Sequence, residues 1–498
     1  MAVSPTAHRT GHLRAGAPQP DRRITHQPLD LVSNGAVNQG ASLPDAQGDR
    51  LFRNTFTLLI SNGSGAVLGV AFWAFAARLY SPDFVGDGAA EVNAMTLLAS
   101  FALLNLGTVF PRFLYAAGSR AGVILRAGYA ASTSIALVAS IVFLLVTSGH
   151  RDYMQPGPLA EIVFVAAVVL WVIFTIEDAA LVGLRAPFWV PVENTTFSVV
   201  KIALLPVFLV VAPRVGVFTS WVLPVVACVC AINLYLFRRV VPAHVRRSSG
   251  AGVLPERKVV GKILLGEYFG GLSLTAMTTL PALFIVATLG KAQAAYFQTP
   301  WLAGMSFDFL LYSFATSLIV EATARPSMAA ATVRKSIRLA AWVLGPSVIV
   351  ILVCAPWFLQ ILGSDYAAHG TRLLHYLALA MPFMAVNVLY VTFARLARRV
   401  RRVLFVQVSI AAIVLTLCYV LISRIGISGA GVALLAGQGV VGLILLPSVV
   451  RQLRHPDMSP SFAPGAALVN RSRSAPNGGD TVDEDRTTSR DPEGGAER

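Results

Sequence analysis

Apolar blocks of about 20 residues recur along most of this chain, and short polar turns separate them. A helix of about 20 apolar residues is long enough to cross the roughly 30 Å hydrocarbon core of a bilayer. Inside lipid each segment must satisfy its own backbone hydrogen bonds, which helices do and open sheets do not. The pattern therefore predicts an all-α membrane protein. Composition agrees, because 55% of the 498 residues are hydrophobic and 13% are charged, against roughly 25% charged in soluble proteins.

The blocks predict about twelve transmembrane helices. The predicted spans are residues 55–79, 90–111, 122–147, 159–183, 196–212, 217–237, 262–289, 298–322, 337–362, 373–394, 403–423 and 428–450. The longest polar connection follows the sixth span, so the helices divide into two sets of six.

Arginine and lysine residues are distributed among the connections in a way that predicts a topology. The even-numbered connections carry most of them, whereas each odd-numbered connection holds one. Because cytoplasmic loops of membrane proteins are enriched in Lys and Arg, both termini are expected in the cytoplasm. The net charge of +15 then reflects topology. We expect no nucleic-acid partner, because the arginines form no single basic face.

This pattern divides the chain into five parts. Residues 1–50 and 452–498 are polar tails, predicted to be disordered and cytoplasmic, and the first contains no apolar core of a signal peptide. Residues 51–239 and 262–451 are predicted to form an N-terminal and a C-terminal six-helix bundle. A basic cytoplasmic linker, residues 240–261, joins the two bundles. The halves are faintly similar in sequence, which is consistent with parallel repeats.

Ionisable residues inside apolar blocks are costly in lipid, so each is a candidate functional residue. Glu177 and Asp178 on the fourth span and Lys201 on the fifth are expected at similar depths. They either neutralise one another or line a polar path, and the two interpretations are compatible. Glu267 and Asp308, on the seventh and eighth spans, have no obvious local partner. Each is expected to face a water-filled cavity or to take a buried hydrogen-bonded role.

The sequence contains no pattern that predicts catalysis. Its glycine clusters lack the Lys-Ser/Thr of a phosphate-binding loop, and its four cysteines fall inside apolar blocks without metal-ligand spacing. We therefore expect no enzymatic activity, no catalytic residue, no cofactor and no metal site.

Several segments resemble one family. Residues 177–208, EDAALVGLRAPFWVPVENTTFSVVKIALLPVF, look like the mid-chain signature of bacterial polysaccharide flippases, in which an acidic residue, a Gly-Leu-Arg turn and a helix bearing a lysine recur. Residues 53–86, the segment ending in FPRF (110–113) and residues 361–403 are similar to other parts of these proteins. The resemblance covers residues 51–451. The family belongs to the multidrug/oligosaccharidyl-lipid/polysaccharide exporter superfamily.

The resemblance implies two six-helix bundles around a central cavity that opens alternately to each side of a bacterial cytoplasmic membrane. The implied function is to flip a polyprenyl-diphosphate-linked oligosaccharide to the outer leaflet for surface polysaccharide biosynthesis. The implied partners are this lipid-linked oligosaccharide, membrane lipids, a polysaccharide polymerase, glycosyltransferases and a coupling H⁺ or Na⁺.

Matching the family's motifs suggests roles for the ionisable residues. Arg112, Arg185 and Lys201 become candidate contacts for phosphate or the cavity, and Arg112 and Arg185 equally fit a positive-inside role. The candidate counter-charges or ion-coupling residues are Glu177, Asp178, Glu267 and Asp308.

Three alternatives remain. A cation-coupled multidrug exporter of the same superfamily would resemble proteins with acidic residues in the first span, and residues 55–79 contain none. A peptidoglycan-precursor flippase is usually longer by two spans and more charged inside. A membrane-embedded glycosyltransferase or polymerase would need a larger outer loop than this chain provides.

Overall fold

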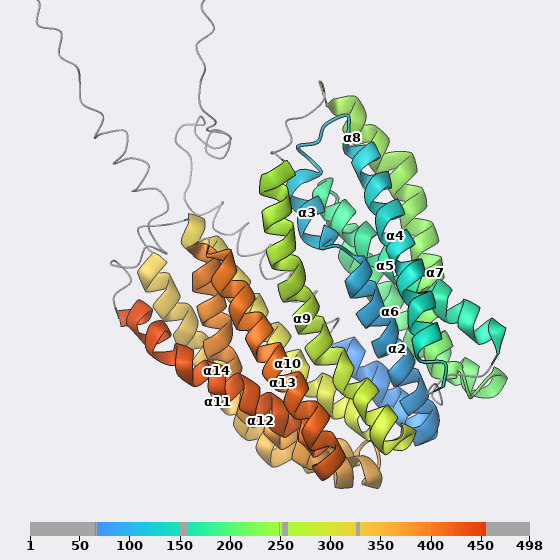
Figure 1. The fold of residues 1–498 in the computed structure, drawn as a ribbon, viewed down its shortest axis with the longest axis vertical. Helices are drawn as coiled ribbons and strands as arrows, with labels where there is room; N and C mark the ends of the chain where they lie inside the picture. The colour runs from blue at the N-terminus through green and yellow to red at the C-terminus, as the bar shows by residue number, and fades with distance from the viewer. Residues whose placement is uncertain are drawn as a thin grey trace, which may run out of the picture. The chain divides into compact units, whose positions relative to one another are not determined.

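A computed structural model describes residues 65, 67–149, 157–248, 250, 257–324, 329–397 and 399–454 of the chain. Within these ranges, side chains are described except at 257–266, 307–310, 312–341, 343 and 454. The predicted N-terminal tail and nearly all of the C-terminal tail lie outside the described residues. Helices make up almost all of the described chain (Figure 1).

We call residues 67–248 the N-terminal half and residues 257–454 the C-terminal half. The helices of the N-terminal half are Val67–Leu79, α2 (Pro82–Ala102), α3 (Leu106–Phe113), α4 (Ala121–Val146), α5 (Pro158–Gly183), α6 (Trp189–Val211), α7 (Gly216–Tyr235), the π-helical turn η1 (Leu236–Val240) and α8 (Val241–Arg247). Those of the C-terminal half are α9 (Arg257–Leu289), α10 (Lys291–Ala324), α11 (Ala329–Gln360), α12 (Ser364–Leu396), α13 (Val400–Ile425) and α14 (Ser428–Arg454).

The prediction of an all-α membrane protein is confirmed, and each predicted span overlaps described helices, although residues 55–64 and 66 of the first span lie outside the described residues. By length and composition, eight of the described helices could cross a membrane, or nine if α2 and α3 form one bent span. Val67–Leu79 and Leu344–Gln360 are shorter apolar helices. The cytoplasmic position of the termini and the domain boundaries remain predictions.

The second predicted span, 90–111, differs most from the structure. Helix α2 already begins at Pro82, with proline in its first turn, where the missing N–H breaks no helical hydrogen bond. The helix then breaks at Leu104 and Asn105, whose φ angles are 48° and 59°. Helix α3 leaves this break at an angle of 48° to α2. The span is therefore longer than predicted and bent near its end.

Helix α2 lies at the boundary between the two halves. It contacts α4, α5 and α7 of the N-terminal half as well as α9 and α10 of the C-terminal half. Every residue from Val85 to Met95 is buried. The remaining contacts lie mostly within each half: α6 packs on α7, α4 on α5, α12 on α10, α11 and α14, and α13 on α9 and α14.

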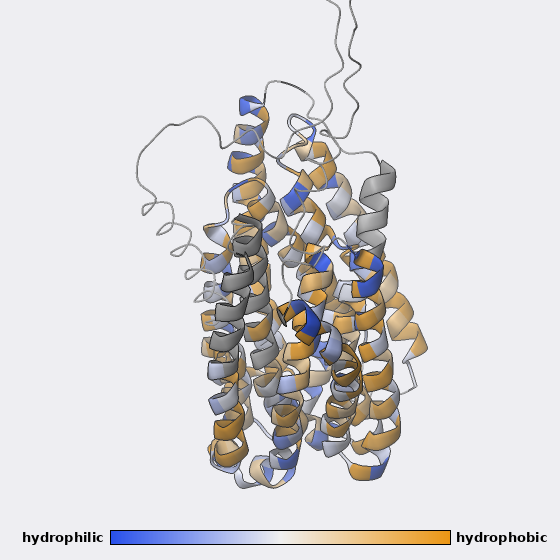
Figure 2. Ribbon diagram, turned by 90° about the vertical axis from the view of Figure 1, so that its left-hand side faces the viewer, coloured by the Kyte–Doolittle hydropathy of each residue, from blue (hydrophilic) through white to orange (hydrophobic). Residues whose placement is uncertain are grey.

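Large apolar side chains cover much of the surface formed by the described helices. Val and Leu side chains of α4, α6 and α14 are among the exposed ones, and Figure 2 shows long hydrophobic stretches along the helices. An apolar surface of this extent is unfavourable in water and favourable against lipid tails. The chain is a multi-pass membrane protein.

Candidate functional site

Three carboxyl groups come together inside the N-terminal half, and we call them the carboxylate cluster: Glu177 and Asp178 on α5, and Glu193 on α6. Glu177 is 0% exposed and Glu193 is 3% exposed. Glu177 and Glu193 are close enough to act on each other electrostatically, and the charge of Asp178 acts on both. All three lie within two turns of the connection between α5 and α6, which is predicted to be cytoplasmic.

Only two amide groups are seen to donate hydrogen bonds to the carboxylate cluster among the described residues. Asn194 Nδ2 donates to Asp178 Oδ2 at 2.9 Å, and Asn233 Nδ2 of α7 donates to Glu177 Oε2. Neither oxygen of Glu193 has a hydrogen-bond partner there. The other oxygens of Glu177 and Asp178 and the hydroxyl of Tyr129 on α4 are also unpartnered.

The carboxylate cluster therefore lacks sufficient compensation for three negative charges. The two ion pairs seen in the described chain, Arg112–Glu267 and Lys291–Asp87, do not involve it. Isolated carboxylates inside a membrane are too costly to stay ionised without a counter-ion, because hydrocarbon does not solvate them. The cluster must bind protons or a cation to be stable. No group of three or more His, Cys, Asp or Glu in the described ranges is arranged to hold a metal ion.

Lys201 lies on the same buried face of α6, two turns beyond Glu193, and is 3% exposed. Its Nζ lies over three aromatic rings, at 3.7 Å from the ring centre of Trp221, 4.5 Å from Phe197 and 5.2 Å from Phe72. Cation–π attraction of this kind stabilises a desolvated ammonium group by about 2 kcal/mol.

The predicted neutralisation of Lys201 by Glu177 or Asp178 is not formed among the described side chains. Phe197 lies between Glu193 and Lys201 on the buried face of α6, and it packs on Phe174 and Trp171 of α5 with ring centres 5.4 and 5.8 Å apart. Equal depth along two helices is not sufficient for contact, because this aromatic layer separates the ammonium from the carboxylates. The alternative expectation, that Lys201 faces a polar path, remains a prediction.

A second polar site lies at the boundary between the halves and was missed by the sequence analysis. Lys291, the first residue of α10, forms an ion pair with Asp87 of α2, with Nζ 3.0 Å from Oδ1 and 3.1 Å from Oδ2. Glu91 follows one turn later on α2 and is buried. Asn93 Nδ2 then donates to Gln298 Oε1 of α10 at 3.0 Å. In the sequence, residues 82–89 are polar enough to resemble a loop. The signal that could have indicated a helix is the i, i+4 spacing of Asp87 and Glu91 after Pro82.

Arg112 and Glu267, two of the predicted site residues, are brought together from the two halves. Arg112 Nη2 of α3 lies 3.3 Å from Glu267 Oε1 of α9, and their side chains are 48% and 23% exposed. Tyr268, the next residue, donates its hydroxyl to the backbone carbonyl of Phe101 at 2.7 Å. Glu267 therefore has a partner that sequence reasoning did not find.

Arg185 and Asp308 complete the predicted set. Arg185 is exposed after α5, and its guanidinium carbon lies 3.8 Å from the ring centre of Tyr115. Its φ of 62° is in the left-handed region, which is uncommon for a residue other than glycine. The side chain of Asp308 lies outside the described residues.

No family model and no curated protein matches the chain, but solved structures share its fold. The inward-facing conformation of a multidrug resistance MATE family transporter of the MOP superfamily aligns with a TM-score of 0.56 and 15% identity, over 80% of this chain and 98% of that one. A MOP superfamily transporter from Pyrococcus furiosus, described by a reversed polarity of its binding pocket, aligns with a TM-score of 0.57 and 14% identity, over 80% and 95%. An outward-facing MATE conformation aligns with a TM-score of 0.52 and 16% identity, over 80% and 94%.

At these identities the likeness establishes the fold alone. Two of these structures are of multidrug resistance MATE family transporters, and the Pyrococcus furiosus transporter is described by a binding pocket that suggests a different function. The chain has the fold of the MOP-superfamily transporters.

Proposed function

We propose that this protein is a membrane transporter that moves an amphipathic organic solute across a bacterial cytoplasmic membrane by alternating access. The observation that carries this proposal is the uneven contact between the halves along α2. Alternating access requires a contact between two bundles that is closed at one end and open at the other.

The contact is tight at the end of α2 that begins with Pro82, which we call the sealed end. A Cβ added at Gly86 would overlap the carbonyl oxygen of Lys291, so the two backbones touch. The Lys291 and Asp87 side chains of the neighbouring ion pair are 33% and 10% exposed, less than the 48% and 23% of the Arg112–Glu267 pair.

At the other end, which we call the open end, the contacts between the halves are accessible to solvent. The Arg112–Glu267 pair and the Tyr268–Phe101 hydrogen bond are both exposed. With the predicted topology the sealed end is extracytoplasmic, so this proposal assigns the structure to an inward-open state.

The charges near the proposed path favour a cationic or neutral solute over a diphosphate. Arg112 is paired with Glu267, and Lys201 is covered by aromatic rings. The N-terminal half instead contains four buried carboxyl groups, those of Asp87, Glu91, Glu177 and Glu193. This distribution, together with the neighbours of the multidrug branch, supports the multidrug-exporter alternative.

We propose further that the carboxylate cluster is the coupling site and that its ligand is a proton. Glu177 and Glu193 are close enough to act on each other electrostatically, and two neighbouring carboxyl groups in an apolar environment are more stable when they hold one proton between them. Loss of that proton leaves two negative charges close together in an apolar environment. Their repulsion would favour a different conformation of the N-terminal half.

Transport by the full-length chain in liposomes tests both proposals. With an imposed proton gradient, we expect the chain to concentrate a fluorescent lipophilic cation such as ethidium. Glu193→Gln should abolish the dependence on the gradient, whereas Asp83→Asn, which removes an exposed carboxylate of α2, should not. If the chain moves no organic cation with or without a gradient, the multidrug proposal is wrong.

The polysaccharide-flippase expectation is the second candidate, and the resemblance of residues 177–208 supports it. A deletion strain distinguishes the two. Normal resistance to cationic drugs, together with lost surface polysaccharide and lipid-linked oligosaccharide accumulating on the cytoplasmic leaflet, would replace the first proposal by the second. Sensitivity to cationic drugs with normal polysaccharide would support the first.

A further inference from the structure

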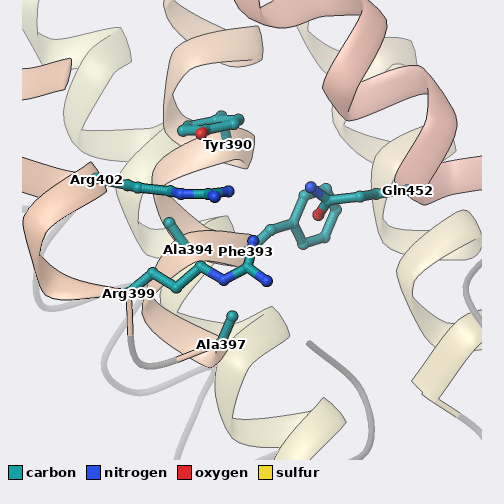
Figure 3. A pocket seen from close by; sticks show the side chains of 7 residues that line it. All are labelled: Tyr390, Phe393, Ala394, Ala397, Arg399, Arg402 and Gln452. Atoms are coloured by element: carbon teal, nitrogen blue, oxygen red, sulfur yellow. The ribbon is translucent and has the colours of Figure 1, made fainter. Parts of the chain in front are cut away.

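A small pocket lies where α12 ends, α13 begins and α14 passes nearby. We call it the arginine pocket, and its lining residues are Tyr390, Phe393, Ala394, Ala397, Arg399, Arg402 and Gln452. In Figure 3 the side chains of Arg399 and Arg402 extend in the same direction, toward Phe393 and Gln452. Its volume is 10 Å³, about enough for one water molecule. A larger ligand would therefore lie at the mouth, where both arginines are exposed.

The charges of the arginine pocket are not balanced within the described chain. None of its lining residues is acidic, and neither ion pair of the described residues involves Arg399 or Arg402. No described side-chain hydrogen bond is formed by either guanidinium group. Two like charges side by side repel each other, and an anion lying between them would replace this repulsion by attraction.

The start of α13 adds to this imbalance. Arg399 is its N-cap residue and makes no side-chain capping hydrogen bond, and the first turn contains no acidic residue. The N-terminus of a helix carries a partial positive charge, so nearby cations are unfavourable and anions are favourable. The backbone N–H groups of Arg402 and Val403 bond to the carbonyl oxygen of Arg399. Those of Val400 and Arg401, at the first helical positions, have no carbonyl within the helix to bond and can donate to the same anion.

The arginine pocket also lies at the boundary between apolar and polar surface. Phe405, one turn into α13, is 73% exposed. Val408 of α13 and Leu446 of α14 are exposed as well. These side chains would contact the acyl chains of a lipid. The headgroup of that lipid would then lie at the level of Arg399 and Arg402. Basic pockets between transmembrane helices on the cytoplasmic side bind anionic headgroups in other membrane proteins.

We propose that the arginine pocket binds the phosphate of an anionic membrane lipid. The guanidinium groups of Arg399 and Arg402 contact the phosphate oxygens, and the acyl chains lie along Phe405. The site is separate from the carboxylate cluster and from the contact between the halves, so it does not depend on the transported solute.

Lipid binding to the purified full-length protein in a neutral detergent tests the proposal. Phosphatidylglycerol, phosphatidylcholine and inorganic phosphate are titrated separately, and binding is followed by native mass spectrometry and by the melting temperature. Each arginine near a membrane surface contributes about 1 kcal/mol to the binding of anionic lipid. The double variant Arg399→Gln/Arg402→Gln should therefore bind phosphatidylglycerol roughly 30-fold more weakly.

The matched control is Arg424→Gln, which removes an exposed arginine from the last turn of α13, at the other end of the helix from the pocket, and should bind phosphatidylglycerol like the unaltered protein. The variant Arg399→Lys/Arg402→Lys retains both positive charges, so it should keep most of the phosphatidylglycerol binding. This variant also controls for the effect of changing the side chains at these two positions. Equal affinity for phosphatidylglycerol in the double glutamine variant would overturn the proposal, and so would equal affinity of the unaltered protein for phosphatidylcholine. If inorganic phosphate displaces the lipid and stabilises the protein equally, the pocket binds free phosphate and the lipid assignment is wrong.

Discussion

Replacing Gly86 by alanine should loosen the sealed end, because there is no space for a methyl group between α2 and α10. The added Cβ would overlap the carbonyl group of Lys291, which is backbone and has no alternative rotamer. Inserting a methyl group into a closely packed contact costs about 1–3 kcal/mol. Since 1.4 kcal/mol corresponds to a tenfold change, the closed arrangement of this end should become roughly 5- to 140-fold less favourable.

Thiol labelling measures this shift. In a variant without the native cysteines, Asn93→Cys places a thiol in the buried contact with α10, just inside the sealed end. A membrane-impermeant reagent added outside cells should label it slowly in the parent and much faster with Gly86→Ala. Gly69→Ala is the matched control, because a Cβ there meets Leu302 of the opposite half at an ordinary 3.8 Å.

Equal labelling rates in the Gly86→Ala variant and its parent would refute the reasoning. So would an increase of the same size with Gly69→Ala, because any small perturbation of the contact would then be sufficient. A melting temperature within a few degrees of the parent shows that the labelled protein is folded.

Three further predictions follow from the described side chains. Lys201→Met should preserve or raise the melting temperature, because it removes a buried charge that has only aromatic neighbours; a marked decrease would show that Lys201 has an anionic partner. Glu193→Gln should leave the binding of the organic cation within a factor of about three, measured by fluorescence titration, while it abolishes gradient-driven accumulation; loss of binding would place Glu193 in the solute site. Arg112→Gln should change the free energy of unfolding by no more than about 1 kcal/mol, because its pair with Glu267 is exposed; a larger loss in denaturant unfolding would show that this pair holds the halves together.

Hydropathy was sufficient to predict the helices, because a bilayer requires about 20 apolar residues for each crossing. It failed at the start of α2 for a physical reason. Asp87 and Glu91 are polar, but they face the other half, where Lys291 is the partner of Asp87. A count of apolar residues cannot detect a partner that is about 200 residues away in sequence. The start of the helix was therefore assigned to a loop.

The carboxylate cluster was found only in part, for a related reason. Glu177 and Asp178 stood out because they interrupt an apolar block, whereas Glu193 lies before the predicted start of the fifth span at 196. The structure begins α6 at Trp189, which places Glu193 inside the helix. Depth along a helix follows from 1.5 Å per residue, but the side that a residue faces depends on tertiary packing. The sequence therefore could not show that aromatic rings surround Lys201.

The bend between α2 and α3 has a consequence for how such a molecule moves. Helix α3 is tied to α5, because a Cβ at Gly183 would overlap the backbone of Phe110, whereas α2 rests against α10. Leu104 and Asn105 lie between these two contacts, and we expect the angle between α2 and α3 to change there during transport. Spin labels on α3 and α5 should keep a constant separation through the transport cycle, while the separation between α2 and α10 changes.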